Sequence, residues 1–448
     1  MRKFLFTACA LLFAYSVAAS ESIGGTWSGK LQLGAQRSLK LVFHISASDS
    51  TVTMDSPDQG AKGIECEVLY LSDDSVSCRV SKMRMSYNGA LADGVIEGTF
   101  KQGAYNFPLS LHRGEDKVNR PQTPVPPFPY SIESVTVAND SVSLSGTLCV
   151  PQNYSASTPV VLLVSGSGLQ NRDEELFEHK PFAVIADYLA RNGIASLRYD
   201  DRGIGESTGD VLNATTADFA ADAKMMIEWL RSKNRFGKIG LVGHSEGGQI
   251  AYMLGSKNNV LDFIVAIAGP SIRGNKTIAF QNKVALVKSG IAENITDEFA
   301  TALEKAFEYK LAYPEVTEIS DEKIKELYPQ CNEDMFTRQL AASMKSMLAA
   351  QPSNPWMMFF LDYDPEADLK ALAIPALIIY GEKDRQVPPS LNLAPALRYA
   401  TGAQVKSYPE LNHLMQHAVT GEVEEYSSIE ETISPEVLAD IAAFIKGL

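Results

Sequence analysis

The sequence predicts an α/β sheet with a helical cap insertion, preceded by a small all-β, barrel-like domain. Two observations predict this division. Short runs that alternate between apolar and polar residues fill positions 24–113, and such runs are typical of antiparallel strands. After five prolines between Pro121 and Pro129, unbroken apolar runs alternate with helical patterns instead, which is typical of a buried parallel sheet.

The composition is that of a globular protein. The chain has 448 residues, of which 45% are hydrophobic and 21% charged, and its length suits two or three domains. The formal net charge is -14, with 40 basic and 54 acidic residues, so the chain has no basic field that would hold a phosphate backbone. We therefore do not expect nucleic acid as a partner.

The first 19 residues have the pattern of a secretory signal peptide. A basic start, Met1 to Lys3, precedes an apolar run from Phe4 to Val17 and small residues from Ala18 to Ser20. We expect cleavage after Ala19 and export to the periplasm, the cell envelope or the exterior. The apolar run is shorter than the about 20 residues of a spanning helix, so no membrane span is expected.

Residues 20–118 form the predicted all-β domain. Its expected strands cover residues 39–45, 63–69, 75–80, 94–100 and 107–112, separated by Gly, Asp, Ser and Pro. The first strand carries Trp27 and the last ends in Arg113, a pairing that resembles the Trp and Arg that close one end of lipocalin-like barrels. An ordinary core position for Trp27 is the alternative.

Four cysteines remain in the expected mature chain, at positions 66, 78, 149 and 331. Cys66 and Cys78 flank a turn-like segment at residues 71–75, so a hairpin would place them opposite each other. In an oxidising compartment they could form a disulfide, and two unpaired thiols in strands are the equal alternative.

The proline-rich residues 119–130 are the predicted linker, and residues 131–448 form the second domain. Its expected strands cover residues 134–138, 142–150, 160–164, 194–199, 239–242, 263–268, 376–380 and 404–408. Helices are expected over residues 182–189 and after Thr216 as the cap residue. Between Pro270 and Pro375 the connection is far longer than an ordinary crossover. We interpret residues 271–374 as a helical cap, with helices over 297–311, 321–328 and 334–350.

Ser245 is the predicted nucleophile. It lies in Gly243-His244-Ser245-Glu246-Gly247, directly after the strand at 239–242 and before a predicted helix that starts near Gln249. A G-x-S-x-G motif in this strand-turn-helix context is typical of a nucleophile elbow, in which the glycines allow a sharp turn that projects the serine hydroxyl above the sheet.

A serine nucleophile needs a histidine base, and the histidine needs an acid to orient it. Asp384 directly follows the strand at 376–380, and His413 follows the strand that ends at Tyr408. Because the carboxyl ends of parallel strands meet at one edge of the sheet, Ser245, Asp384 and His413 are predicted to form a catalytic triad.

Two alternative assignments of the catalytic base and acid remain open. His417 could replace His413 as the base, and Glu382 could replace Asp384 as the acid. The spacing of His413 and His417 also suits two metal ligands on a helix, but the zincin motif needs Glu where this chain has Leu414. We expect neither a metal nor a cofactor.

The oxyanion hole requires two backbone N–H donors. One is predicted at Glu246, the residue after the nucleophile. The other is predicted at Ser167 or Gly168 in the glycine-containing loop that follows the strand at 160–164. An ordinary turn between strand and helix is the alternative for this loop.

Residues 130–448 resemble the α/β-hydrolase superfamily. The motifs that carry this resemblance are Ser165-Gly166-Ser167-Gly168, Tyr199-Asp200-Asp201-Arg202-Gly203-Ile204-Gly205, Gly243-His244-Ser245-Glu246-Gly247, Asp384 and Asn412-His413. Asn171-Arg172-Asp173-Glu174 and His179-Lys180-Pro181-Phe182 further resemble secreted or cell-envelope bacterial carboxylesterases of the esterase D type, which also carry an N-terminal β-domain.

The resemblance implies hydrolysis of short-acyl esters by a Ser-Asp-His triad without a metal, acting on a small-molecule substrate. Asp200 and Arg202 are expected to pair structurally near their turn. A prolyl-oligopeptidase-type peptidase or an acyltransferase is the alternative activity, and a propeller with repeated blades, usual for that peptidase type, is not evident. The acyl group, the role of the β-domain and the oligomeric state are left open.

Overall fold

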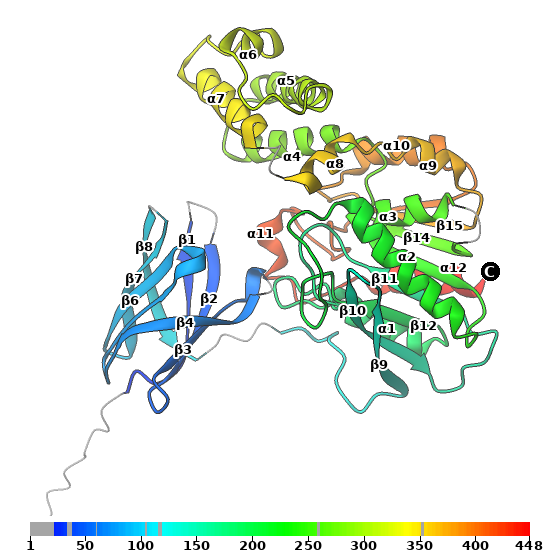
Figure 1. The fold of residues 1–448 in the computed structure, drawn as a ribbon, viewed down its shortest axis with the longest axis horizontal. Coiled ribbons are helices and arrows are strands. Elements are labelled where there is room, and N and C mark those ends of the chain that lie inside the picture. The colour runs from blue at the N-terminus through cyan, green and yellow to red at the C-terminus, as the bar shows by residue number, and fades with distance from the viewer. Residues whose placement is uncertain are drawn as a thin grey trace, which may run out of the picture. The chain divides into compact units, whose positions relative to one another are not determined.

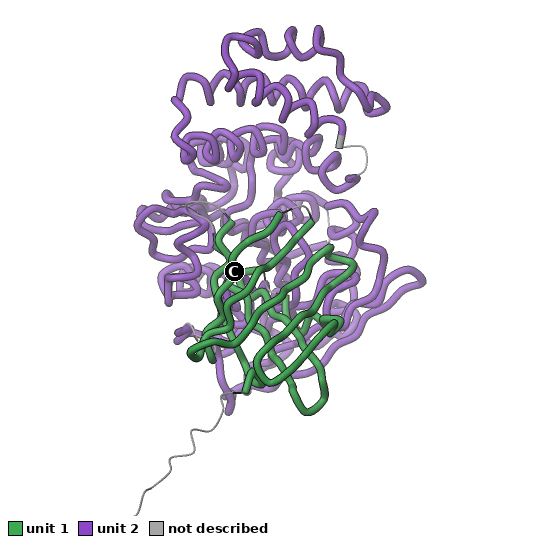
Figure 2. The backbone as a smooth tube through the Cα atoms, turned by 90° about the vertical axis from the view of Figure 1, so that its left-hand side faces the viewer, with its two compact units in different colours: residues 1–117 green, residues 118–448 purple. Residues whose placement is uncertain are grey.

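A computed structural model describes residues 22–33, 38–59, 61–103, 105–114, 119–257, 260–350 and 354–448. The chain divides into two compact units, residues 1–117 and 118–448 (Figure 2). The expected signal peptide lies outside the described residues. Among the helices that are described, none is long and apolar enough to cross a membrane.

Unit 1 is a closed barrel of eight antiparallel strands (Figure 1). The strands are β1 (Gly25–Gln32), β2 (Ser38–Ser46), β3 (Thr51–Ser56), β4 (Ala61–Leu71), β5 (Ser75–Val80), β6 (Met85–Ala92), β7 (Val95–Gln102) and β8 (Tyr105–Arg113). Each strand pairs with the next, and β8 closes the barrel on β1. The predicted barrel is confirmed, although sequence reasoning missed β3 and β6, in which small and polar residues outnumber the large apolar ones.

Large aromatic side chains fill the barrel. Trp27, Phe43 and Tyr87 are fully buried, and the rings of Phe43 and Tyr87 lie 5.0 Å apart. The guanidinium of Arg113 lies 4.2 Å from the ring centroid of Trp27, and the indole N–H donates to the carbonyl of Ile23. Trp27 is therefore both a core residue and the partner of Arg113 that the sequence predicted.

The four cysteines among the described residues are buried free thiols. The predicted register of the hairpin was wrong, because Cys78 pairs with Val68 and not with Cys66. The turn closes between Ser72 and Ser75, later than predicted, so Cys66 and Cys78 lie diagonally across the ladder, close enough for a hydrogen bond between their thiols.

Unit 2 is built on an eight-stranded sheet with the order β16-β15-β14-β13-β11-β12-β10-β9. The strands are β9 (Tyr130–Ala138), β10 (Ser143–Pro151), β11 (Val160–Val164), β12 (Ala195–Tyr199), β13 (Ile239–His244), β14 (Phe263–Ile267), β15 (Ala376–Gly381) and β16 (Gln404–Tyr408). The six strands from β11 to β16 are parallel, and β10 and β9 complete the sheet in antiparallel pairs. The order confirms the predicted α/β-hydrolase sheet.

Helices cover both faces of this sheet. Apolar residues of α2 (Thr216–Ser232), α3 (Glu246–Gly255), α9 (Glu366–Ala371) and α10 (Pro389–Tyr399) pack on one face, and those of α1 (Pro181–Arg191) and α12 (Pro435–Lys446) on the other. The predicted cap residue of α2 was wrong by one position. Thr215 forms a capping box with Asp218, which frees the Thr216 hydroxyl to donate to Glu246.

The inserted cap contains α4 (Gly274–Lys288), α5 (Glu293–Ala312), α6 (Asp321–Leu327), α7 (Met335–Ala350) and α8 (Pro355–Asp362). Sequence patterns predicted α5, α6 and α7 but missed α4 and α8. Phe299, Leu303, Phe307 and Tyr328 lie in the cap's own core. Figure 1 shows α5, α6 and α7 grouped beyond α4 and α8.

The start of the proline-rich segment is held by the body of unit 2. The guanidinium of Arg120 donates to the carbonyls of Phe177, Ser427 and Ile429, and the Gln122 side chain exchanges hydrogen bonds with the backbone of Thr432 and Ile433. Apart from Phe177, these partners follow α11 (Val423–Tyr426), in the segment beyond the loop of His413. Residues 119–123 thus brace that part of unit 2.

Candidate active site

Ser245 forms a sharp elbow between β13 and α3. Its backbone has φ 51 and ψ −114, an uncommon conformation for a residue with a side chain. The flanking glycines make the turn possible, because a Cβ at Gly243 would lie 2.0 Å from the carbonyl oxygen of Gly247. A Cβ at Gly247 would lie 2.1 Å from the carbonyl oxygen of Val164. Backbone crowding therefore requires both glycines of the motif.

Asp384 and His413 form a buried pair. Nδ1 of His413 lies 2.7 Å from Oδ2 of Asp384, and both side chains are almost fully excluded from solvent. The other carboxylate oxygen accepts the backbone N–H groups of Gln386 and Val387. These two bonds fix the carboxylate, so His413 donates its Nδ1 proton and presents Nε2 as the atom that can accept one.

The rival residues lie elsewhere. Glu382 is exposed and accepts a hydrogen bond from Ser407. His417 is half-exposed and pairs with Glu431 at 2.8 Å. Neither residue contacts the Asp384–His413 pair through a described hydrogen bond.

His244 connects the elbow to the histidine loop. Its ring centroid lies 4.8 Å from that of His413, and its Nε2 lies 3.0 Å from the carbonyl oxygen of His413. Among the hydrogen bonds of the described residues, none joins Ser245 Oγ to His413. In enzymes without bound substrate this contact is often long and shortens when substrate binds.

Glu246 follows Ser245 at the elbow, and the loop of the other predicted donors approaches the elbow at Gly166, where a Cβ would lie 3.1 Å from that of Ser245. The N–H of Glu246 is the first of α3, so it has no acceptor within the helix and it shares the favourable field of the helix N-terminus. In the loop after β11, the N–H of Gly166 is taken by Oε1 of Glu174 at 2.7 Å. Ser167 and Gly168 are exposed and follow directly. The predicted second donors are thus the next two N–H groups of that loop.

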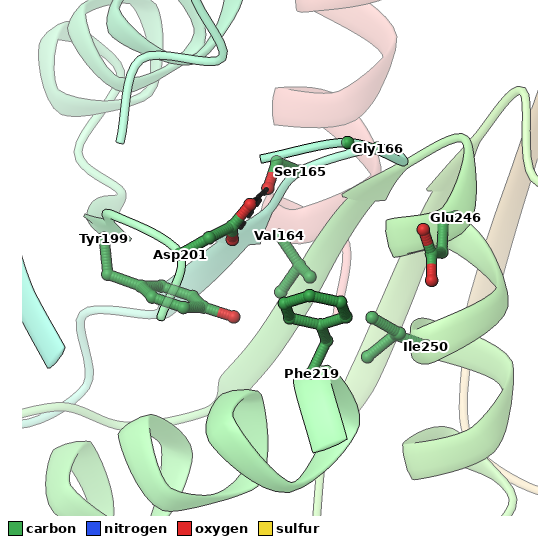
Figure 3. A pocket seen from close by; sticks show the side chains of 9 residues that line it. Val164, Ser165, Gly166, Tyr199, Asp201, Phe219, Glu246 and Ile250 are labelled. Atoms are coloured by element: carbon green, nitrogen blue, oxygen red, sulfur yellow. Dashed lines mark hydrogen bonds between the residues drawn. The ribbon is translucent and has the colours of Figure 1, made fainter. Parts of the chain in front are cut away.

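A small pocket adjoins this loop (Figure 3). Ser165, Asp201, Phe219 and Glu246 line it, and its volume of about 10 Å³ suits about one water molecule. Burial raises the pKa of Asp201 to about 8, against hydrogen bonds from Gln170 and Ser165 that lower it. Asp201 is therefore largely protonated at neutral pH, so the pocket carries less negative charge than its two carboxyls suggest.

Glu246 also reaches the cap. Thr216 Oγ1 donates to its Oε1 at 2.6 Å, and the indole N–H of Trp356 in α8 donates to the same oxygen at 2.8 Å. Burial raises the pKa of this carboxyl. The residue after the nucleophile thus joins α2, α3 and the cap, a role that the sequence did not predict for either Glu246 or Trp356.

Asp200 and Arg202 do not pair with each other, contrary to prediction. Asp200 accepts two hydrogen bonds from the guanidinium of Arg172, at 3.1 and 2.5 Å. Arg202 forms a bidentate ion pair with Asp222 in α2. The two residues are structural, as expected, but their side chains hold different elements of the unit.

The family model described as serine aminopeptidase, S33, matches residues 178–418, more than half of the chain. The chain belongs to this family of α/β-hydrolases. Esterase EstD from Thermotoga maritima is 26% identical over 337 residues, which cover 69% of this chain and 72% of that protein. An acyl transferase from Shewanella hanedai is 30% identical over 141 residues, 31% of this chain and only 42% of that protein.

Two solved structures show a more distant likeness. The Pyrococcus furiosus esterase Pf2001 is 16% identical with a TM-score of 0.43, over 75% of this chain and 99% of that chain. Est1E from Butyrivibrio proteoclasticus, bound to ferulic acid, is 14% identical with a TM-score of 0.41, over 70% of this chain and all of that chain. Neither likeness is close enough to inform the site.

Sequence reasoning gave no role to Glu174 and set His244 aside. The structure places both among the three loops of the site. His244 could have been found from its position before the nucleophile, whereas no sequence pattern links Glu174 to it across 70 residues.

Proposed function

We propose that this serine hydrolase cleaves short-acyl carboxylic esters through an acyl-enzyme on Ser245. The observation that carries the proposal is the buried Asp384–His413 pair at the same sheet edge as the strained elbow of Ser245. The likeness to an esterase over most of the chain supports the ester as substrate.

In this mechanism Nε2 of His413 takes the proton of the Ser245 hydroxyl as Oγ attacks the ester carbonyl. The N–H of Glu246 and that of Ser167 or Gly168 stabilise the negative charge that develops on the carbonyl oxygen. His413 then gives its proton to the departing alcohol. Water, activated by His413 in the same way, attacks the acyl group and releases the carboxylic acid.

Throughout these steps Asp384 keeps its charge. It accepts the Nδ1 proton of His413 and stabilises the imidazolium that forms twice in each cycle. Because two backbone N–H groups hold the carboxylate, it does not have to reorient as the charge on His413 changes.

Acyl transfer and peptide cleavage are the competing activities. Acyl transfer is favoured by the relatives named acyl transferase, and peptide cleavage by the family's description as serine aminopeptidase. All three activities pass through an acyl-serine and differ in the leaving group or in the group that removes the acyl chain.

A panel of substrates separates them. We expect the purified protein to hydrolyse acetate and butyrate esters of a chromogenic alcohol faster than aminoacyl or prolyl anilides. Faster turnover of an anilide would contradict the proposal in favour of a peptidase. A second series with a competing alcohol measures the ratio of new ester to free acid, and a ratio that exceeds one at low alcohol concentration would indicate a transferase.

A further inference from the structure

Glu174 and His244 connect all three loops of the candidate site. Oε1 of Glu174 accepts the N–H of Gly166 at 2.7 Å and lies 2.9 Å from Nδ1 of His244. Nε2 of His244 lies 3.0 Å from the carbonyl oxygen of His413. One carboxylate and one ring therefore join the oxyanion loop, the end of β13 and the loop of the proposed base.

Both side chains are buried, with 6% exposure for Glu174 and 9% for His244. Glu174 also has a φ of 51, a left-handed backbone conformation that is unfavourable for a residue with a side chain. Such a conformation persists only where the surroundings hold it. The hydrogen bonds of the Glu174 carboxylate to Gly166 and His244 hold the residue in this conformation.

The partners of His244 determine where its protons are. The carbonyl of His413 can only accept a hydrogen bond, so Nε2 of His244 carries a proton. Nδ1 faces a carboxylate oxygen that already accepts one N–H, and two lone pairs facing each other at 2.9 Å would repel. A second proton therefore lies between Nδ1 and Oε1, most simply on an imidazolium beside a carboxylate.

The charged neighbours of His244 favour this state. Glu174 faces it from the oxyanion loop and Asp384 attracts it from the loop after β15, whereas the ring of His413, 4.8 Å away on the loop after β16, contributes no negative charge. The small cavity beside the pair is otherwise lined by apolar side chains, including Phe182, Ile267 and Met415. Burial lowers the pKa of His244, but attraction to Glu174 and its hydrogen bond outweigh burial and the pKa is raised.

We propose that Glu174 and His244 are a positioning pair for the ester hydrolysis proposed above, on which this inference rests. The pair and the proton it shares hold the oxyanion loop against the elbow and fix the backbone of His413. Loss of the shared proton at alkaline pH breaks the contact between the two loops. The pair acts on the geometry of the reacting groups, so its loss lowers kcat more than it raises KM.

Glu174→Gln and His244→Gln test the pair, with His44→Gln as the matched control. His44 makes a histidine–carboxylate contact of the same length, to Asp55 in the barrel. At pH 7.5 we expect kcat for a small ester to fall by about 10- to 100-fold in both test variants, with KM changed less than about threefold. We expect the wild type and the control to lose activity at alkaline pH. His244→Gln should lack that loss, because glutamine at position 244 has no proton to lose.

A second measurement does not depend on turnover. In protein labelled with ¹⁵N-histidine, the resonance that disappears in His244→Gln should report a doubly protonated ring at pH 7.5 in the wild type and a neutral ring in Glu174→Gln. A neutral ring in the wild type overturns the proposal, even if Glu174→Gln does not fold, because the assignment needs only His244→Gln. Wild-type kcat and an unchanged pH profile in both variants also overturn it. An absence of esterase activity in the wild type would instead contradict the proposed function. The histidine resonance would then still test whether Glu174 and His244 share a proton.

Discussion

An ion pair of the barrel and two ion pairs of the hydrolase unit differ in burial. In the barrel, the pair Arg79–Glu67 lies at the surface, with 47% and 55% of the two side chains exposed. In the hydrolase unit, the pairs His413–Asp384 and His244–Glu174 are almost fully buried. Burying a charge costs several kcal/mol even when it is paired. The hydrolase unit bears this cost where three loops meet, which supports the proposal that the chemistry lies in unit 2.

Removal of the proposed nucleophile in unit 2 should have the largest effect on activity. Ser245→Ala should lower ester hydrolysis by a factor of about 10⁴ to 10⁶, because no acyl-enzyme can form. Circular dichroism and thermal unfolding of the variant should match the wild type, since the hydroxyl is not needed for the fold. Turnover near the wild-type rate in a folded Ser245→Ala protein would exclude the proposed mechanism.

The next test compares two histidines of one loop. His413→Ala should reduce kcat by at least about 10³-fold, whereas His417→Ala should change it by less than about threefold. The reason is that His413 is buried against Asp384 and His417 is half-exposed against Glu431. The opposite ranking, measured on the same ester, would exchange their roles.

Two truncations locate the boundary between the units. Deletion through residue 117 removes the barrel and should leave kcat/KM for a small ester within about threefold, because all the proposed groups lie in unit 2. Deletion through residue 122 also removes Arg120 and Gln122, which brace the segment at 427–433. We expect activity to fall at least about tenfold further. Equal activity of the two truncations would show that the brace is dispensable, and an inactive but folded first truncation would assign the barrel a part in the site.

The smallest effect concerns stability against pH. His179 is fully buried and bonded to Thr432, and burial together with the charge of Arg120 lowers its pKa to about 4. Because this pKa lies below the unfolded value, the neutral ring stabilises the fold above pH 6.5, and that contribution is lost as the pH falls toward 4. Between pH 7 and pH 5 the free energy of unfolding should drop by about 2 kcal/mol from this group alone.

His179→Gln should flatten this dependence, and His417→Gln, at a half-exposed position of the same unit, should not. Thermal unfolding of the three proteins at pH 5, 6 and 7 measures the slopes. A slope of His179→Gln equal to that of the wild type would contradict the assignment.

The sequence by itself determined the two-part architecture and the three candidate catalytic residues. Period-two runs predicted the barrel, and unbroken valine-rich runs predicted the parallel sheet, because the pattern of apolar residues records which faces of a strand are buried. Ser245, Asp384 and His413 could be selected because each follows the carboxyl end of a strand. This placement depends on local order along the chain and not on contacts.

Only the tertiary structure decided what depends on contacts between distant residues. It set the β4–β5 register that places Cys66 diagonally from Cys78, paired Arg172 with Asp200, and brought Glu174 to His244. No local periodicity encodes such partners, because a carboxylate is satisfied by whichever donor the packed elements bring within about 3 Å. The sequence therefore specified which groups are available, and the fold specified which of them meet.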